Sequence, residues 1–183
     1  WMFLTAGIVM GGYWAYEMLG WGGYWAWDPV ENSSLIPWLI GVASIHTMLV
    51  QKRSLKTTDG IGRYAKTNLI LSILTYVLVL YSTFLTRSGV LGDASVHSFV
   101  DPGNLVYFFL VIFISTFIAI GIGGIAYRWK YLEDKTVYEE SVLSRELSLF
   151  TAAIILVASA IIVLVGTSAP LFGQSVDTFF YDE

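Results

Sequence analysis

The sequence of 183 residues contains no cysteine, and only 13% of its residues are charged. The absence of cysteine excludes disulfide frameworks, zinc–cysteine sites, iron–sulfur clusters and thiol nucleophiles. The low charge excludes a water-soluble globule, because about a quarter of the residues of soluble domains are charged. The sequence has ten lysines and arginines and 14 aspartates and glutamates, and no run of basic residues lies beside a group of aromatic residues. We therefore expect no nucleic-acid binding.

Long apolar runs dominate the chain, in which 56% of the residues are hydrophobic. A helix needs about 20 apolar residues to cross a bilayer, and continuous runs favour helices over the alternating strands of a barrel. The fold expected is an all-α integral membrane protein with about five transmembrane helices. They cover approximately residues 2–19, 35–50, 68–85, 105–127 and 147–166. We interpret residues 1–183 as one membrane domain and, because Trp1 opens inside an apolar run, as a fragment of a larger or split protein.

Basic residues set the expected orientation. Nine of the ten lysines and arginines lie in the connections after the second and fourth runs. By the positive-inside rule these connections face the cytoplasm or the matrix of an organelle. The Trp-rich segment 20–34, the loop 87–104 and the C-terminal tail then face outward.

Aromatic rings crowd the first of these outward segments. Five of the seven tryptophans lie between residues 14 and 38, and WGGYWAWD occupies residues 21–28. Tryptophan and tyrosine also form belts at membrane surfaces, but belts are spread over span ends, whereas these rings belong to one loop. A large flat apolar ligand explains the density better, because ring contacts contribute about 0.5–1.5 kcal/mol each beyond burial. The ligand that this suggests is haem.

The residues after the aromatic cluster predict the start of a helix. Asp28 suits the N-cap and Pro29 the first helical position. Glu31 lies where a reciprocal capping bond to the cap residue is possible. The second span therefore begins near Pro29. The apolar run at residues 35–50 would by itself be short for a membrane span. Asn32-Ser33-Ser34 matches a glycosylation sequon, which we interpret as coincidental because it abuts a span.

The iron of a haem needs an axial donor, and without cysteine the two histidines are candidates. His97 lies in the outward loop on the side of the Trp-rich segment, so the two can meet over one ligand. Arg87, the sole basic residue on that side, could bind a haem propionate or pair with Asp28, Glu31 or lipid phosphate.

His46 is the second histidine, and it lies about 25 Å along the span that begins at Pro29. An ionisable group at that depth indicates a functional site, with a neutral imidazole bonded to a neighbouring helix as the alternative. One haem could not easily reach both histidines. Elsewhere, Gly7 and Gly11 form a G-x-x-x-G pair and glycines cluster at 121–124, which predicts close helix packing.

Two segments resemble a known family. WGGYWAWD resembles the WWD signature of haem-handling proteins of cytochrome c maturation, and the DPVENSSLIPWL that continues it resembles the CcmF family. TFLTRSGVLGDASVHSF at residues 83–99 is similar to the CcmF segment that leads to an outward haem-ligand histidine. The resemblance covers about residues 20–99.

This resemblance implies a haem lyase component. CcmF proteins receive haem from the chaperone CcmE and, with CcmH-type partners, attach its vinyl groups to apocytochrome c. His97 would be the axial ligand with the catalytic role, and His46 one ligand of an embedded b-type haem. The family's other outward and embedded ligand histidines have no counterpart here, so the remaining part of the CcmF protein would be required. The other residues implied in haem binding are Trp21, Gly22, Gly23, Tyr24, Trp25, Trp27, Asp28, Glu31 and Arg87.

The resemblance also implies a location and leaves two alternative functions. It places the chain in the bacterial inner membrane with the WWD segment on the periplasmic side, or in the mitochondrial inner membrane. A transmembrane haem exporter would use His46 and His97 as relay points. A structural membrane subunit would use the Trp-rich loop only to dock a partner of the maturation complex.

Overall fold

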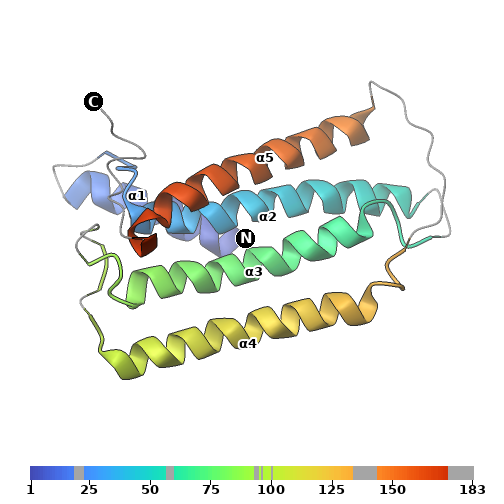
Figure 1. Ribbon diagram of the computed structural model, residues 1–183. Coiled ribbons are helices and arrows are strands. Elements are labelled where there is room, and N and C mark those ends of the chain that lie inside the picture. The colour runs from blue at the N-terminus through green and yellow to red at the C-terminus, as the bar shows by residue number, and fades with distance from the viewer. Residues whose placement is uncertain are drawn as a thin grey trace.

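A computed structural model describes the chain in several stretches. They are residues 1–18, 23–56, 60–92, 95, 97–99, 101–133 and 144–172. The described elements are all helical, which confirms the all-α prediction (Figure 1). The order along the chain is α1 (Met2–Met18), α2 (Pro29–Ser54), α3 (Ala65–Arg87), α4 (Asn104–Arg128), α5 (Arg145–Thr167) and the short 3₁₀ helix η1 (Ala169–Phe172).

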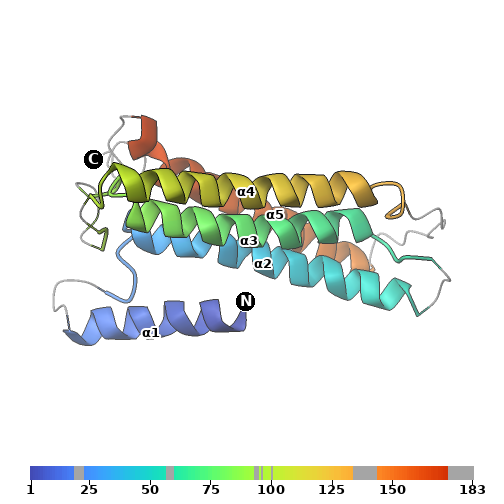
Figure 2. The same ribbon diagram turned by 90° about the horizontal axis from the view of Figure 1, so that it is seen from below.

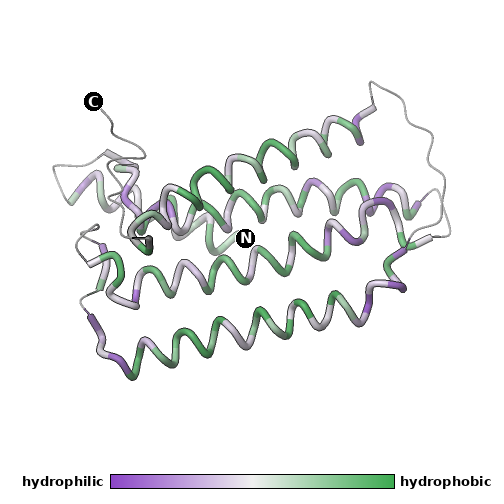
Figure 3. Tube along the Cα trace, in the orientation of Figure 1, coloured by the Kyte–Doolittle hydropathy of each residue, from purple (hydrophilic) through white to green (hydrophobic). Residues whose placement is uncertain are grey.

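Four helices of the described chain, α2 to α5, are long and apolar enough to cross a membrane. Figure 3 shows hydrophobic residues along the length of α4 and α5, with hydrophilic residues gathered near the helix ends. α1 has 17 described residues, at the lower limit for a helix that spans a bilayer. The described part of the chain therefore has four such helices, where the sequence predicts about five.

α2 begins as the sequence predicts. Asp28 is its N-cap and accepts a hydrogen bond from the Val30 N–H at 2.9 Å, and Pro29 is its first residue. The predicted partner of Glu31 is wrong, because its carboxylate accepts from the Ala26 N–H at 2.8 Å. Glu31 thus ties the preceding loop to the helix, where a capping box would bond the cap residue itself.

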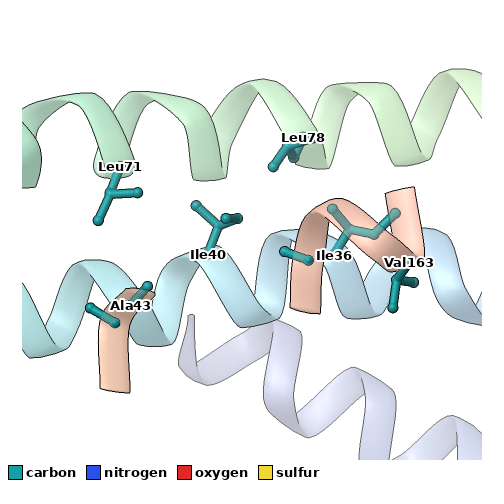
Figure 4. Close-up of a cluster of buried hydrophobic side chains, with 8 residues drawn as sticks. Ile36, Ile40, Ala43, Leu71, Leu78 and Val163 are labelled. Atoms are coloured by element: carbon teal, nitrogen blue, oxygen red, sulfur yellow. The ribbon is translucent and has the colours of Figure 1, made fainter. Parts of the chain in front are cut away.

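α2 is the centre of the bundle and packs mainly against α3 and α5. Figure 4 shows its side chains Ile36 and Ile40 pointing toward α3, where Leu71 and Leu78 lie. Small residues serve the contact with α5, because Ala43 and Ala160 are both fully buried in the same cluster. Small side chains let helix backbones approach closely in a membrane.

Polar side chains also join α2 to α3 at both ends of the contact. The Ser33 and Ser82 hydroxyls lie 2.8 Å apart toward the start of α2. Toward its end, the Ser44 and Ser72 hydroxyls lie 2.9 Å apart. Each such bond between membrane helices is worth about 0.6 kcal/mol on average, so they fix the helix register more than they add stability.

The glycines divide into packed and open positions. A Cβ on Gly121 of α4 would lie 2.8 Å from the Ile73 side chain of α3, which confirms close packing at that glycine. The prediction is wrong for the other two glycines of the cluster, Gly123 and Gly124, because a Cβ built on either meets no described atom within 4 Å. The same prediction is wrong for Gly7 and Gly11 of α1, because no atom of the described chain lies within 4 Å of a Cβ built on either. Something other than helix packing within the described chain must account for these two glycines.

The helix ends that flank the two basic connections, namely the ends of α2 and α4 and the starts of α3 and α5, lie at the same end of the bundle, as predicted (Figure 1). At the basic end, the carboxylate of one residue of α5 forms ion pairs with two arginines from other parts of the bundle. Glu146, in the first turn of α5, pairs with Arg53 of α2 and with Arg63, at 3.6 Å in each case. The aromatic segment and the loop that carries His97 are consequently neighbours at the opposite end.

Candidate functional site

A buried asparagine shapes the aromatic segment. Asn32, in the first turn of α2, is fully buried. Its Nδ2 donates to the Trp27 carbonyl at 2.8 Å, and its Oδ1 accepts from the Trp25 indole at 3.3 Å. Trp27 has a φ of 59°, a left-handed conformation that costs a bulky residue energy unless its surroundings hold it. Asn32 therefore fixes both the turn and the direction of the Trp25 ring.

The same segment is docked on α1. The Tyr24 ring stacks on Tyr16 with centroids 4.5 Å apart and planes 6° apart. Gly12 lies beneath the segment, where a Cβ would be only 2.8 Å from the Tyr24 carbonyl oxygen. A side chain at position 12 would therefore push the segment away from the helix.

His97 is brought to the aromatic segment by Asp28. Ser95, 67 positions beyond Asp28 in the chain, donates from its hydroxyl to Asp28 Oδ2 at 2.7 Å. The His97 N–H in turn donates to the Ser95 hydroxyl oxygen at 3.1 Å. The imidazole Nδ1 then lies 3.2 Å from Asp28 Oδ2. One carboxylate thus caps α2 and anchors the loop that carries the histidine.

This arrangement leaves one ring nitrogen of His97 for a ligand. The Nδ1 atom is buried, makes no aligned hydrogen bond within the described chain, and has the Asp28 carboxylate as its polar neighbour at 3.2 Å. A carboxylate at one imidazole nitrogen orients the ring and makes the other nitrogen a stronger metal donor. Nε2 of His97 is therefore the atom suited to ligate a metal.

A cavity of about 410 Å³ joins these residues. Tyr24, Trp25, Glu31 and His97 all line it, together with residues of α1, α2 and α3. The structure thus brings four of the residues singled out from the sequence to one hollow between segments that are far apart in the chain. Its lining is mostly apolar, with a few convergent polar groups, as is usual for ligand sites.

The other candidates lie elsewhere. Among the described residues, Trp27 and Gly23 do not line the cavity. Arg87 does not line it either, and its guanidinium lies 5.0 Å from the centre of the Phe99 ring. Trp21 and Gly22 lie outside the described residues.

His46 lies apart from this cavity, in the second half of α2. Its Nδ1 is 2.8 Å from the Val42 carbonyl oxygen, one turn earlier in the same helix. A carbonyl oxygen can only accept, so Nδ1 is the donor in this contact, and in the neutral ring Nε2 is the nitrogen with the free lone pair. At about 1.5 Å per residue, His46 is about 27 Å along α2 from Asp28, so the two histidines do not form one site.

Comparisons with known proteins agree with the two recognised segments. Residues 1–91 match the profile of the family described as cytochrome C assembly protein. The chain is 42% identical to the cytochrome c-type biogenesis protein CcmF of Haemophilus influenzae, over 93% of this chain and 24% of that protein. It is 41% identical to the cytochrome c-type biogenesis protein CycK of Bradyrhizobium diazoefficiens, over 100% of this chain and 27% of that protein.

A solved structure gives the same relationship. The structure described as cytochrome c heme lyase CcmF matches 97% of this chain with a TM-score of 0.64 and 36% sequence identity, and the match covers 24% of that protein. The chain thus spans about a quarter of the length of the relatives that it matches. On these grounds, together with the two motif segments, the chain belongs to the CcmF family of cytochrome c assembly proteins.

Proposed function

We propose that this chain is the part of a haem lyase that holds haem while it is attached to apocytochrome c. The observation that carries the proposal is the shared cavity, in which an oriented imidazole, His97, faces the same hollow as the Tyr24 and Trp25 rings. A planar apolar group with a ligatable metal fits that combination of rings and donor. Haem is here the substrate.

Each residue of the site has a distinct task in this proposal. Nε2 of His97 binds the iron, and Asp28 orients the ring from Nδ1. Trp25 contacts the macrocycle, and Asn32 holds the Trp25 indole in place. Glu31 keeps the loop close to the start of α2 through its bond to the Ala26 N–H.

The reaction itself needs orientation more than acid or base groups. In thioether formation the S–H of an apocytochrome cysteine adds across a vinyl double bond, so that sulfur bonds one carbon and hydrogen the other. The substrate supplies the reactive vinyl group, and the protein supplies position. We propose a CcmE-type chaperone as the haem donor, a CcmH-type subunit as the thiol partner, and the remaining part of the CcmF protein as the source of further ligands.

His46 is the residue that would bind the iron of a second, resident haem of b type. Its Nδ1 contact with the Val42 carbonyl would make Nε2 the nitrogen that ligates iron in the neutral ring. Such a group would supply an electron for reduction of the substrate iron. His46 would provide one donor, and a residue of another part of the protein the second, because the chain has only His97 besides it.

The orientation in the membrane follows from the charges. Arg53, Arg63 and Glu146 mark the basic end of the bundle, which the positive-inside rule assigns to the cytoplasm. The cavity with His97 would then open toward the periplasm of a bacterial inner membrane, where apocytochrome c is matured, or toward the corresponding side of a mitochondrial inner membrane.

Replacing Trp25 with leucine tests the proposal. We expect haem binding by the complete CcmF-type protein to weaken about tenfold, since a ring contact is worth up to about 1.5 kcal/mol and about 1.4 kcal/mol corresponds to a factor of ten. Titration of the Soret absorption band measures the affinity. Trp129→Leu is the matched control, because Trp129 lies at the basic end beside Lys66. Equal affinity of the two variants would count against a haem at this site.

Replacing Asp28 with asparagine separates its charge from its capping role. Asparagine also caps helices well, so the start of α2 should survive. Loss of the carboxylate beside His97 should lower haem affinity by about 10- to 100-fold, seen in the same titration. Asp101→Asn is the control. Asp101 lies in the loop that carries His97, is exposed, and its carboxylate accepts a hydrogen bond from the Gly103 N–H at 2.9 Å. A wild-type affinity in Asp28→Asn would remove Asp28 from the proposed ligand system.

A further inference from the structure

α1 contacts the rest of the bundle at its two ends. Near its start, Trp1 stacks on Trp38 of α2 with ring centroids 5.8 Å apart, and the Trp38 indole donates to Thr5 Oγ1 at 2.9 Å. Near its end, Tyr16 stacks on Tyr24 of the aromatic segment. Figure 2 shows α1 set apart from α2, and α1 has far fewer contacts with α2 than α3 and α5 have. α1 is thus held as a separate wall, fastened at both ends.

The cavity of about 410 Å³ lies between this wall and the rest of the site. Trp25 and His97 line it from the loops, and Ser82 and Thr86 from α3. α1 contributes the following residues: Phe3, Leu4, Gly7, Ile8, Gly11, Gly12, Trp14 and Ala15. An indole and an imidazole suited to a metal therefore share one hollow with the surface of α1.

The α1 side of the cavity has clearance at its middle. Gly7 and Gly11 both line the cavity, and a Cβ on either would meet no described atom within 4 Å. Glycine inside a helix is less stable than alanine, and no helix contact in the described chain requires it here. With Ala15 these residues form a smooth strip about 12 Å long. The strip leaves room for a flat group beside the helix.

We infer that α1 is the second wall of the haem site, so that the macrocycle lies in the cavity with the Gly7–Gly11 strip on one side and the Trp25 and His97 side opposite. This inference rests on the proposed function and adds the place where the haem lies. A flat ring can approach a helix closely only where side chains are absent. The haem then lies between α1 and the loops, and Trp27, which does not line the cavity, makes no contact with it.

Replacing Gly11 with leucine in the complete CcmF-type protein tests this inference. A Cβ at position 11 meets no described atom within 4 Å, and the leucine then extends into the cavity, so we expect folding to be retained while haem affinity falls at least about tenfold, the equivalent of about 1.4 kcal/mol. Gly124→Leu in α4 is the matched control, because a Cβ there also meets nothing within 4 Å of the described chain and lies outside the cavity lining. Soret titration gives the affinity, and thermal unfolding in detergent shows whether both variants fold.

The outcomes separate the two proposals. If wild-type protein binds haem through His97 and Gly11→Leu binds it as tightly as Gly124→Leu, the haem lies elsewhere, such as on the outer face of the aromatic segment, and the inference about α1 fails alone. If replacement of His97 leaves the haem spectrum unchanged, the proposed function itself fails. Gly7→Leu provides a second position on the strip, and we expect it to weaken binding in the same way.

Discussion

A protein with His97 replaced by glycine is expected to lose cytochrome c maturation to the background level. The imidazole is the described donor that faces the cavity with the Trp25 ring, and its loss removes the bond that fixes the iron. Loss of a metal ligand should cost more than the roughly 10- to 100-fold that follows from changing its outer partners. Haem-stained cytochrome c in cells that carry the complete maturation system measures the effect.

Rescue distinguishes ligation from a merely structural role. Glycine at position 97 leaves space for free imidazole, which should restore the ligand band of the bound haem and part of the maturation. Ser98→Gly is the control for a more mobile loop, because Ser98 is the next residue along and its hydroxyl bonds the Thr86 carbonyl at 3.4 Å. Full maturation in His97→Gly without added imidazole would contradict the assignment of His97.

Replacing Asn32 with leucine should have the second largest effect, because it acts on the whole aromatic segment. The change removes the bonds to the Trp25 indole and the Trp27 carbonyl at a fully buried position. Each polar group left without a partner costs about 1–3 kcal/mol. We expect haem affinity to fall about 100-fold, the equivalent of about 2.8 kcal/mol, measured by Soret titration, and chymotrypsin, which cleaves after aromatic residues, to cut the Trp- and Tyr-rich segment before α2 faster.

A matched asparagine provides the comparison for this prediction. Asn104 begins α4 at the same end of the bundle and is exposed, so Asn104→Leu should leave haem binding near the wild-type value. If Asn32→Leu binds haem as well as Asn104→Leu, the aromatic segment does not depend on Asn32 for its shape.

Local chemistry explains which parts of the fold were predictable. Asp28 and Pro29 act on adjacent backbone groups, so the start of α2 could be inferred from two residues. The length of the apolar runs likewise predicted α3, α4 and α5. The run predicted at residues 2–19 also agrees with α1, whose described helix is Met2–Met18.

The site required the tertiary structure. The pairing of His97 with Asp28 depends on Ser95, which lies 67 positions away from Asp28, and no local pattern indicates it. Asn32 was interpreted as part of a coincidental sequon, because a side chain that turns back to bond a preceding loop leaves no periodic signal. An asparagine in the first turn after an irregular aromatic segment was the available clue. The haem-binding roles of these residues stay predictions.

The packing of α2 on α5 has a consequence for how the chain assembles. During synthesis α2 enters the bilayer first, while the residues that cover its alanine face, such as Ala160 and Val163, are made only after α3 and α4 have followed. A nascent chain therefore carries an open surface on α2 until α5 has been made. Truncation before α5 would expose that surface of α2 to lipid. The same helix is capped by Asp28, which anchors the loop that carries His97.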